Sequence, residues 1–342
     1  MPLVSLDAIR DAARRISTIA RRTPVLDVSA LADRPLVLKC EPLQPGGAFK
    51  IRGATNMLMR LSPEVLRRGV ITYSSGNHGQ AVALAASRLG APAVIVMPTT
   101  APAVKVAGVK RWGGEVIQEG TTSADRLARA RAEAAARGLT MVPPFDHEWI
   151  IAGQGTCGLE ILEQVPDVDV VVVPVGGGGL ISGVSAAVKL SRPSVTVVGV
   201  EPTGAAKMTA SLAAGHPVTL GSTASIADGL MPVRPGDLTF EHVKAFVDRV
   251  VTVDDAAIAR AALWLFDEAK QVVEPSGAAT VAAVLWPAAD SPLADRSKKV
   301  VAIVSGGNVA PETIAGLRSQ SAAATATTGS GAGGGPGGRD TR

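Results

Sequence analysis

Four consecutive glycines constrain this chain more than any other feature, because of the segments on either side of them. Residues 168–175 before the glycines are short, apolar and β-branched, which predicts a buried parallel strand. Residues 180–190 after them predict a helix. A tight turn needs only one glycine, whereas four leave backbone N–H groups at a helix N-terminus open to an anion. The pattern favours a phosphate-binding loop made of Gly176, Gly177, Gly178 and Gly179.

The loop matches neither of the two common nucleotide-binding motifs. Leu180 and Ile181 stand where a Walker loop carries lysine and a hydroxyl residue. A dinucleotide site needs an acidic residue about 20 positions further on, and Glu201 lies near that distance. This segment alone therefore leaves a dinucleotide site open, and the rest of the sequence argues against it.

Short apolar runs alternate with helical patterns, which predicts an α/β fold of doubly wound parallel sheets with helices on both faces. The strands fall into two groups, so we expect two domains with the active site in the cleft between them. Residues 1–51 and 147–320 are predicted to form a large domain, and residues 52–146 a small mobile domain. Residues 321–342 hold almost no large apolar side chains, so we expect them to be disordered.

Charge and hydropathy argue against other classes of protein. The net charge is +4, but the arginines are spread along helical patterns without interleaved aromatic residues, so we expect no nucleic-acid partner. No apolar stretch reaches the ~18 residues of a membrane span, and the N-terminus lacks the pattern of a signal peptide. Cys40 and Cys157 cannot form a disulfide framework. We therefore expect a cytoplasmic protein without a membrane partner.

One lysine is the first candidate for chemistry. Lys50 follows Phe49 in the segment Gly-Ala-Phe-Lys-Ile-Arg-Gly-Ala at residues 47–54, between a glycine turn and a predicted helix at 53–60. An apolar environment lowers the pKa of a lysine, whose amine can then form a Schiff base or act as a base. An ordinary surface lysine at a helix start explains this segment alone equally well.

Two more predicted strands end in glycine and polar residues. The segment Ser-Ser-Gly-Asn-His-Gly-Gln at residues 74–80 is typical of an anion site suited to a carboxylate. Asn77 in this segment can donate a hydrogen bond to an oxygen on the ring of a bound molecule. For His78, a side chain that is hydrogen-bonded to the backbone is favoured over a catalytic role. The segment Ser-Gly-Gly-Asn at residues 305–308 adds a hydroxyl after the last predicted strand.

These segments resemble, in content and order, the fold-type II pyridoxal-phosphate enzymes, in particular threonine/serine dehydratases and the similar serine racemases. The matching motifs span about residues 10–315, and the segments 152–156, 227–229 and 274–277 are also similar. The resemblance implies a tryptophan synthase β-like architecture and pyridoxal 5'-phosphate as the cofactor. It also implies a small β-hydroxy amino acid as substrate and a homodimer.

The resemblance also implies a role for each matching residue. Lys50 would hold the cofactor as an imine, Phe49 would pack against its ring, and Asn77 would contact the ring oxygen. The glycines would hold the phosphate, and Ser305 would face the pyridine nitrogen. The residues around the substrate carboxylate would be Ser75, Gly76, Asn77 and His78. In racemases, the position of Ser75 holds the proton donor on the opposite face.

The implied reaction is an α,β-elimination. A neutral hydroxyl such as that of Ser305 cannot hold a protonated ring nitrogen as a carboxylate would, so the ring is a weaker electron sink. Prompt loss of the β-substituent is then favoured over a long-lived carbanion. Lys50 would remove the Cα proton and the β-hydroxyl would leave. Threonine would yield 2-oxobutanoate and ammonia, and serine would yield pyruvate and ammonia.

Some positions depart from the family pattern. Many relatives carry hydroxyl residues where this chain has Gly46 and Ala48, so the choice of amino acid stays open. Serine racemases bind a divalent metal through an acidic residue matching Glu201 and a second one six residues later, where this chain has Lys207. An ammonium there could take the place of the cation, so we expect no essential Mg²⁺ site.

Several activities remain open beside a threonine/serine dehydratase. One is an amino-acid racemase with side elimination activity, and another is a dehydratase of a different β-hydroxy amino acid. A β-replacement synthase, such as cysteine synthase, would need a second substrate. A non-catalytic ligand-binding relative is also conceivable, and the intact Lys50 argues against it.

Overall fold

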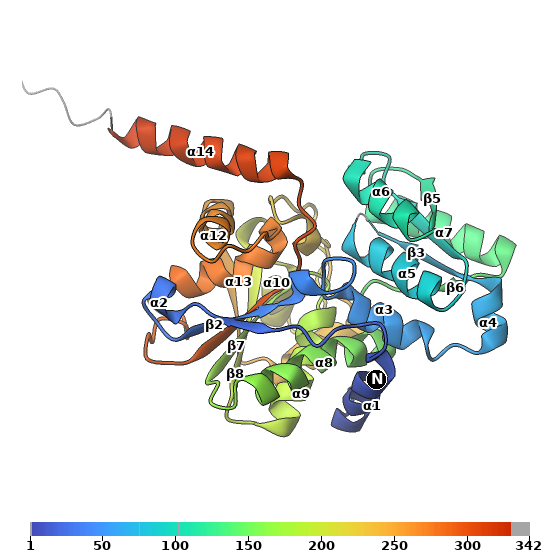
Figure 1. Cartoon of the computed structure of the whole chain (residues 1–342), viewed down its shortest axis with the longest axis horizontal. Coiled ribbons are helices and arrows are strands. Elements are labelled where there is room, and N and C mark those ends of the chain that lie inside the picture. The colour runs from blue at the N-terminus through green and yellow to red at the C-terminus, as the bar shows by residue number, and fades with distance from the viewer. Residues whose placement is uncertain (1, 75, 102, 330–342) are drawn as a thin grey trace, which may run out of the picture.

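The computed structural model describes residues 2–74, 76–101 and 103–329, which contain two sheets (Figure 1). The larger sheet has six strands in the order β1-β2-β10-β7-β8-β9. All neighbours pair in parallel except β1, which is antiparallel to β2. The strands are β1 (Val25–Asp27), β2 (Leu36–Cys40), β7 (Val170–Pro174), β8 (Thr196–Pro202), β9 (Arg249–Val253) and β10 (Val300–Val304).

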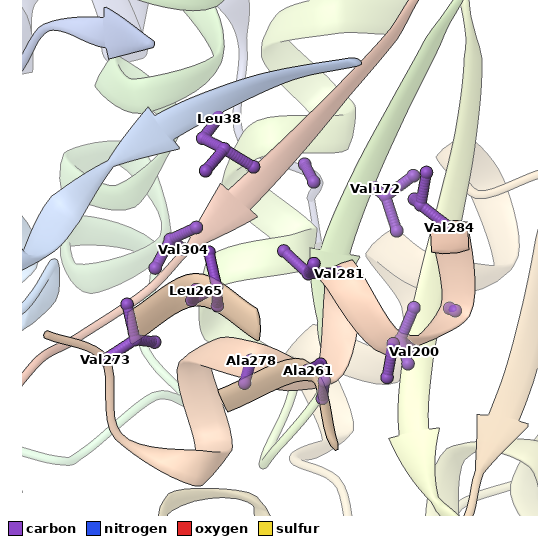
Figure 2. Packing of buried hydrophobic residues seen from close by; sticks show 14 of the residues in the cluster. Leu38, Val172, Val200, Ala261, Leu265, Val273, Ala278, Val281, Val284 and Val304 are labelled. Carbon is purple, nitrogen blue, oxygen red and sulfur yellow. The ribbon is translucent and has the colours of Figure 1, made fainter. Parts of the chain in front are cut away.

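Helices cover both faces of this sheet, which explains why its central strands are apolar throughout. In β7, Val172 faces one core, whereas Val171 and Val173 face the other. Figure 2 shows the first core, where Val281 and Val284 pack toward the strands. The helices on that side are α12 (Asp255–Asp267) and α13 (Pro275–Leu285). The helices on the other side are α8 (Glu148–Gln164), α9 (Gly179–Ser191) and α11 (Asp237–Phe246).

The smaller sheet is parallel throughout and has the strand order β5-β4-β3-β6. Its strands are β3 (Val70–Tyr73), β4 (Ala93–Met97), β5 (Glu115–Gln118) and β6 (Thr140–Met141). One face packs against α3 (Lys50–Leu58), α5 (Asn77–Arg88) and α6 (Ala103–Arg111). The other face packs against α7 (Ser123–Arg137). The predicted α/β fold with parallel sheets is therefore confirmed.

Five further helices belong to the described structure, and α14 extends away from the body of the molecule (Figure 1). They are α1 (Leu6–Ile16), α2 (Ser29–Ala32), α4 (Pro63–Arg68), α10 (Lys207–Ala214) and α14 (Pro311–Gly329). The Ser5 side chain accepts a hydrogen bond from the amide of Ala8 and so caps α1. No helix in the described part of the chain combines the length and the apolar character needed to cross a membrane.

The structure differs from the sequence-based expectations at β1, α3 and α14, among other element boundaries. Strand β1 was not predicted, and its three residues are too few to show a pattern. Helix α3 begins at Lys50 instead of Gly53, because no side-chain cap marks its start. Helix α14 continues to Gly329, which differs from the disorder predicted for residues 321–329. This stretch is rich in alanine, the best helix former, and residues 330–342 lie outside the described chain.

Candidate active site

Lys50 lies partly buried at the first position of α3. Its Nζ donates a 2.8 Å hydrogen bond to the carbonyl oxygen of Pro144 and lies 5.2 Å from the centre of the Phe49 ring. Burial lowers the pKa of Lys50 to about 8, from an ordinary value of 10.5. Near neutral pH, a much larger fraction of this amine is therefore unprotonated than in an exposed lysine, as a nucleophile or base requires.

The segment that contacts Lys50 also contacts the glycine loop, a name we keep for Gly176, Gly177, Gly178 and Gly179. A Cβ on Gly177 would lie 2.3 Å from carbons of the Phe145 ring, so the ring lies directly on the loop. Gly178 has a φ of +101°, which side chains rarely adopt, and a Cβ there would lie 2.7 Å from Cβ of Thr239. Residues 144 and 145 therefore join the glycine loop to Lys50.

The glycine loop has the properties of an anion site. It leads into α9, whose first residue is Gly179. No described residue accepts a hydrogen bond from the backbone N–H groups of the four glycines. Free amides at a helix N-terminus attract and bind phosphate groups, and the helix dipole adds to the attraction. The loop therefore fits the phosphate of a cofactor.

A second helix start provides similar amides. Helix α5 begins at Asn77, and within the described chain the backbone N–H groups of Asn77 and His78 donate to no acceptor. The amide of Gly76 donates a 3.1 Å hydrogen bond to Oγ of Ser74. Ser75 lies outside the described residues, so its predicted roles stay predictions. This start of α5 fits a carboxylate.

The His78 side chain is bonded to backbone, the interpretation that the sequence favoured. Its Nε2 lies 3.2 Å from the carbonyl oxygen of Val142. Burial and the nearby charge of Lys50 lower the pKa of His78 to about 3, although the contact with Val142 opposes this shift. The imidazole is therefore neutral at physiological pH, and it cannot supply a positive charge for a carboxylate.

The end of β10 lies beside the lysine turn. The amide of Phe49 donates a 3.0 Å hydrogen bond to the carbonyl oxygen of Ser305, and Ala48 forms an isolated bridge with Gly306. Ser305 is only 3% exposed, and its hydroxyl forms no hydrogen bond with another described residue. Phe49, Lys50 and Ser305 are therefore brought together, with a hydroxyl free for a ligand.

The Asn77 side chain connects two halves of the molecule. Its Nδ2 donates a 2.6 Å hydrogen bond to Oε1 of Glu274. Its Oδ1 accepts a 3.0 Å hydrogen bond from Asn308, which also donates to the carbonyl oxygen of Gly46 at 2.8 Å. One Nδ2 proton of Asn77 is thus already used within the protein, and the other is free for the predicted contact with a ring oxygen.

Sequence reasoning missed four residues of the site. Lys105 of α6 forms an ion pair with Asp228 in the 3₁₀-helix η3 (Asp228–Leu230) and lies over Gly76. Asp228 and Glu274 belong to sequence segments that resemble the family, so the sequence around them did indicate a functional region. Lys105 and Phe145 carried none, because only the folded chain brings them to the site.

Glu274 gives a test of this geometry. Burial and the neighbouring Asp228 raise the pKa of Glu274 to about 7, although Lys105 and Asn77 oppose the shift. A carboxyl with a raised folded-state pKa stabilises the fold at acidic pH, and this stability is lost as the pH rises through about 7.

Glu274→Gln removes the charge and keeps an oxygen for Asn77. It should raise the free energy of unfolding by up to about 3 kcal/mol near pH 8, and much less near pH 5. Denaturant titrations at both pH values measure this, and an equal effect at both would contradict it.

Comparisons with known proteins agree with this site. Residues 16–306 match the family model described as "Pyridoxal-phosphate dependent enzyme". The chain is 45% identical to an L-threonine ammonia-lyase of Thermotoga maritima, over 90% of this chain and 76% of that protein. It is also 45% identical to a serine racemase of Oryza sativa subsp. indica, over 89% of this chain and 91% of that one.

Solved structures show the same relationship. The structure of maize serine racemase superposes with a TM-score of 0.88 at 42% identity, covering 95% of this chain and all of that chain. The family is dependent on pyridoxal phosphate, and the free amides of the glycine loop, the free Ser305 hydroxyl and the lowered pKa of Lys50 fit that cofactor. The chain belongs to the family of fold-type II pyridoxal-phosphate dependent enzymes.

Proposed function

We propose that the protein is a dehydratase, or ammonia-lyase, that converts L-threonine, L-serine or both into 2-oxobutanoate or pyruvate and ammonia. The observation that carries the proposal is the half-buried amine of Lys50, set beside the Ser305 hydroxyl and joined through residues 144 and 145 to the glycine loop. The similarity to a threonine ammonia-lyase supports this reaction.

In this proposal the free amides of the glycine loop bind the cofactor phosphate. Phe49 packs against the ring, Ser305 faces the ring nitrogen, and Asn77 contacts the ring oxygen. Bound pyridoxal phosphate supplies the electron sink for cleavage at the substrate Cα. The neutral Ser305 hydroxyl leaves the ring nitrogen unprotonated, which favours rapid loss of a β-substituent.

The substrate carboxylate binds at the start of α5, in the loop of Ser75, Gly76, Asn77 and His78, where the N–H groups of Asn77 and His78 are free to donate to it. This arrangement directs the Cα–H bond toward Nζ of Lys50, which takes the proton. The β-hydroxyl takes up one proton, which balances the proton that Lys50 removes from Cα, and leaves as water. One water molecule is taken up when the released product hydrolyses, so the net products are a 2-oxo acid and ammonia.

A racemase is the second candidate, because the rice serine racemase is as similar to this chain as the threonine ammonia-lyase, each at 45% identity. Racemisation requires a proton donor on the face opposite Lys50, and Ser75 is the proposed donor. In that case, Ser75→Ala should abolish formation of D-serine and retain part of the elimination activity.

The deciding experiment measures both products from the same holoenzyme. L-threonine and L-serine are supplied separately, the 2-oxo acids are followed with coupled lactate dehydrogenase, and D-serine is measured by chiral chromatography. The proposal predicts 2-oxo acid formation well above D-serine formation. Predominant D-serine would establish the second candidate instead, and neither product would redirect the search to another β-hydroxy amino acid or a β-replacement.

The low pKa of Lys50 predicts how fast the cofactor couples to the protein. Only the neutral amine attacks an aldehyde, so the coupling rate of cofactor-free protein should rise with pH and level off above about 8. Stopped-flow absorbance with added pyridoxal phosphate measures this rate. A rate that keeps climbing toward the ordinary lysine value of 10.5 would contradict the buried position of the amine.

We also propose the division into a large domain of residues 1–51 and 147–320 and a small mobile domain of residues 52–146. We further propose that the protein is a homodimer in the cytoplasm and that its activity does not require Mg²⁺. Light scattering of the purified protein, and activity in the presence of a chelator, test the oligomer and the metal.

A further inference from the structure

A fully buried lysine lies next to the glycine loop and has no role in the reaction proposed above. Lys207 is the first residue of α10, and its side chain is 0% exposed. Its Nζ donates hydrogen bonds to the carbonyl oxygens of Val175 at 2.8 Å, Ala205 at 3.0 Å and Leu230 at 3.0 Å. Oε1 of Glu201 lies 3.0 Å from the same nitrogen. Four oxygens therefore surround the ammonium, as they would surround a small cation.

Burying an ammonium group costs free energy unless every N–H proton is hydrogen-bonded and a nearby opposite charge balances its own. Burial lowers the pKa of Lys207, and the Glu201 carboxylate opposes the shift. Glu201 is itself fixed, because it accepts hydrogen bonds from the amides of Met208 at 2.9 Å and Thr209 at 2.8 Å. The pair thus joins the start of α10 to the end of β8.

The oxygens around Nζ belong to the segments that shape the glycine loop. Val175 immediately precedes the loop, and Leu230 ends η3. The Gly229 carbonyl oxygen of η3 would lie 2.9 Å from a Cβ on Gly176. From α10, the methyl carbon of Met208 would lie 3.2 Å from a Cβ on Gly178. Lys207 therefore links the strand before the loop with η3 and α10, which both pack against it.

We propose that the Lys207 ammonium is a built-in cation, a positioning residue that holds the glycine loop in the shape that binds the cofactor phosphate. The inference rests on the proposed phosphate-binding role of the glycine loop. It predicts that loss of the ammonium weakens binding of the phosphate group specifically. It also predicts that a small cation of the right shape restores binding.

Two variants separate the charge from the volume of the side chain. Lys207→Ala removes three methylene groups and the ammonium, which n-propylammonium can replace. Lys207→Met fills most of the same space without a charge, so no cation can enter. Lys189→Ala removes a lysine that pairs with Asp248 away from the site and serves as the control. Cofactor-free protein is titrated with pyridoxal phosphate and with pyridoxal, in a buffer whose only cation is the bulky tetramethylammonium.

The proposal predicts about 10- to 100-fold weaker binding of pyridoxal phosphate in both Lys207 variants, the loss typical when a group that orients ligand contacts is removed. Pyridoxal, which lacks the phosphate, should bind all proteins alike. Added n-propylammonium should restore most of the affinity of Lys207→Ala and none of that of Lys207→Met.

Two results would overturn the inference: wild-type affinity in Lys207→Met, or no recovery of Lys207→Ala with any small ammonium ion. If Lys207→Ala does not fold, the affinity of Lys207→Met for the two ligands still decides. The readout is binding, so it does not depend on whether the enzyme is a dehydratase or a racemase. If the wild-type protein itself failed to bind pyridoxal phosphate, the proposed function would fail, independently of Lys207.

Discussion

Lys50→Ala should lower kcat for 2-oxo acid formation by about 10³-fold or more, because one amine serves as both cofactor attachment and base. The absorbance band at about 410 nm that a lysine-bound pyridoxal cofactor gives should disappear. Lys50 is the first residue of α3 and its Nζ has one hydrogen bond within the described structure, so the fold should survive.

The control for this variant is Lys189→Ala, which removes a lysine far from the glycine loop and should keep both the band and the activity. Near-wild-type melting temperatures would show that both variants are folded. Retention of the band together with kcat within about tenfold of wild type would exclude Lys50 as the attachment site.

Arg52→Met should lower the free energy of unfolding by about 3–5 kcal/mol, because it leaves the buried carboxylate of Glu41 without its ion-pair partner. The Arg52 guanidinium forms two 2.8 Å hydrogen bonds with Glu41, and it bonds Glu160 at 2.6 and 2.8 Å. Arg52 is 1% exposed and Glu41 is 0% exposed. Typical total stabilities are about 5–15 kcal/mol, so denaturant titration will detect the loss easily.

The pH dependence and a double variant make the Arg52 prediction specific. Burial would raise the pKa of Glu41, but the Arg52 charge and hydrogen bonds hold it below its ordinary value. Without Arg52, Glu41 should become protonated at higher pH, so the difference from wild type should shrink as the pH falls. Arg52→Met combined with Glu41→Gln should recover part of the loss. An equal loss at all pH values in both variants would contradict the account of a buried, unpaired carboxylate.

Much of the fold followed from local patterns in the sequence. The strands around residues 170–174 and 300–304 are continuous apolar runs ended by glycine, because helices cover both faces and the chain must turn tightly into the next element. The glycine loop could be recognised for the same reason. The three residues of β1 and the uncapped start of α3 carry no comparable local signal.

The site was predictable in its backbone parts and less so in its side-chain pairs. Lys50, Ser305 and the glycine loop follow strand ends or turns, and parallel strands bring such ends together. The pairs Lys105–Asp228 and Asn77–Glu274 join residues far apart in the sequence. Their meeting depends on how the two sheets are placed, which no local pattern encodes. The same is true of the Phe145 ring on Gly177.

The two sheets contribute different functions to the proposed mechanism. The six-stranded sheet and α9 present the phosphate loop and Ser305, which would hold the cofactor. The four-stranded sheet and α5 present the amides that would bind the substrate carboxylate. Asn77 and Lys105 both reach from the second group to residues of the first, so these contacts would couple substrate binding to the alignment of the two groups.

The most direct test of the central claim is to reduce the active holoenzyme with borohydride and map the modified peptide by mass spectrometry. The reductant fixes the cofactor to the amine that carries it, so the account predicts a pyridoxyl group on Lys50 and on no other lysine. A pyridoxyl group on another lysine, or an unmodified Lys50 in protein that has lost its activity on reduction, would contradict the account.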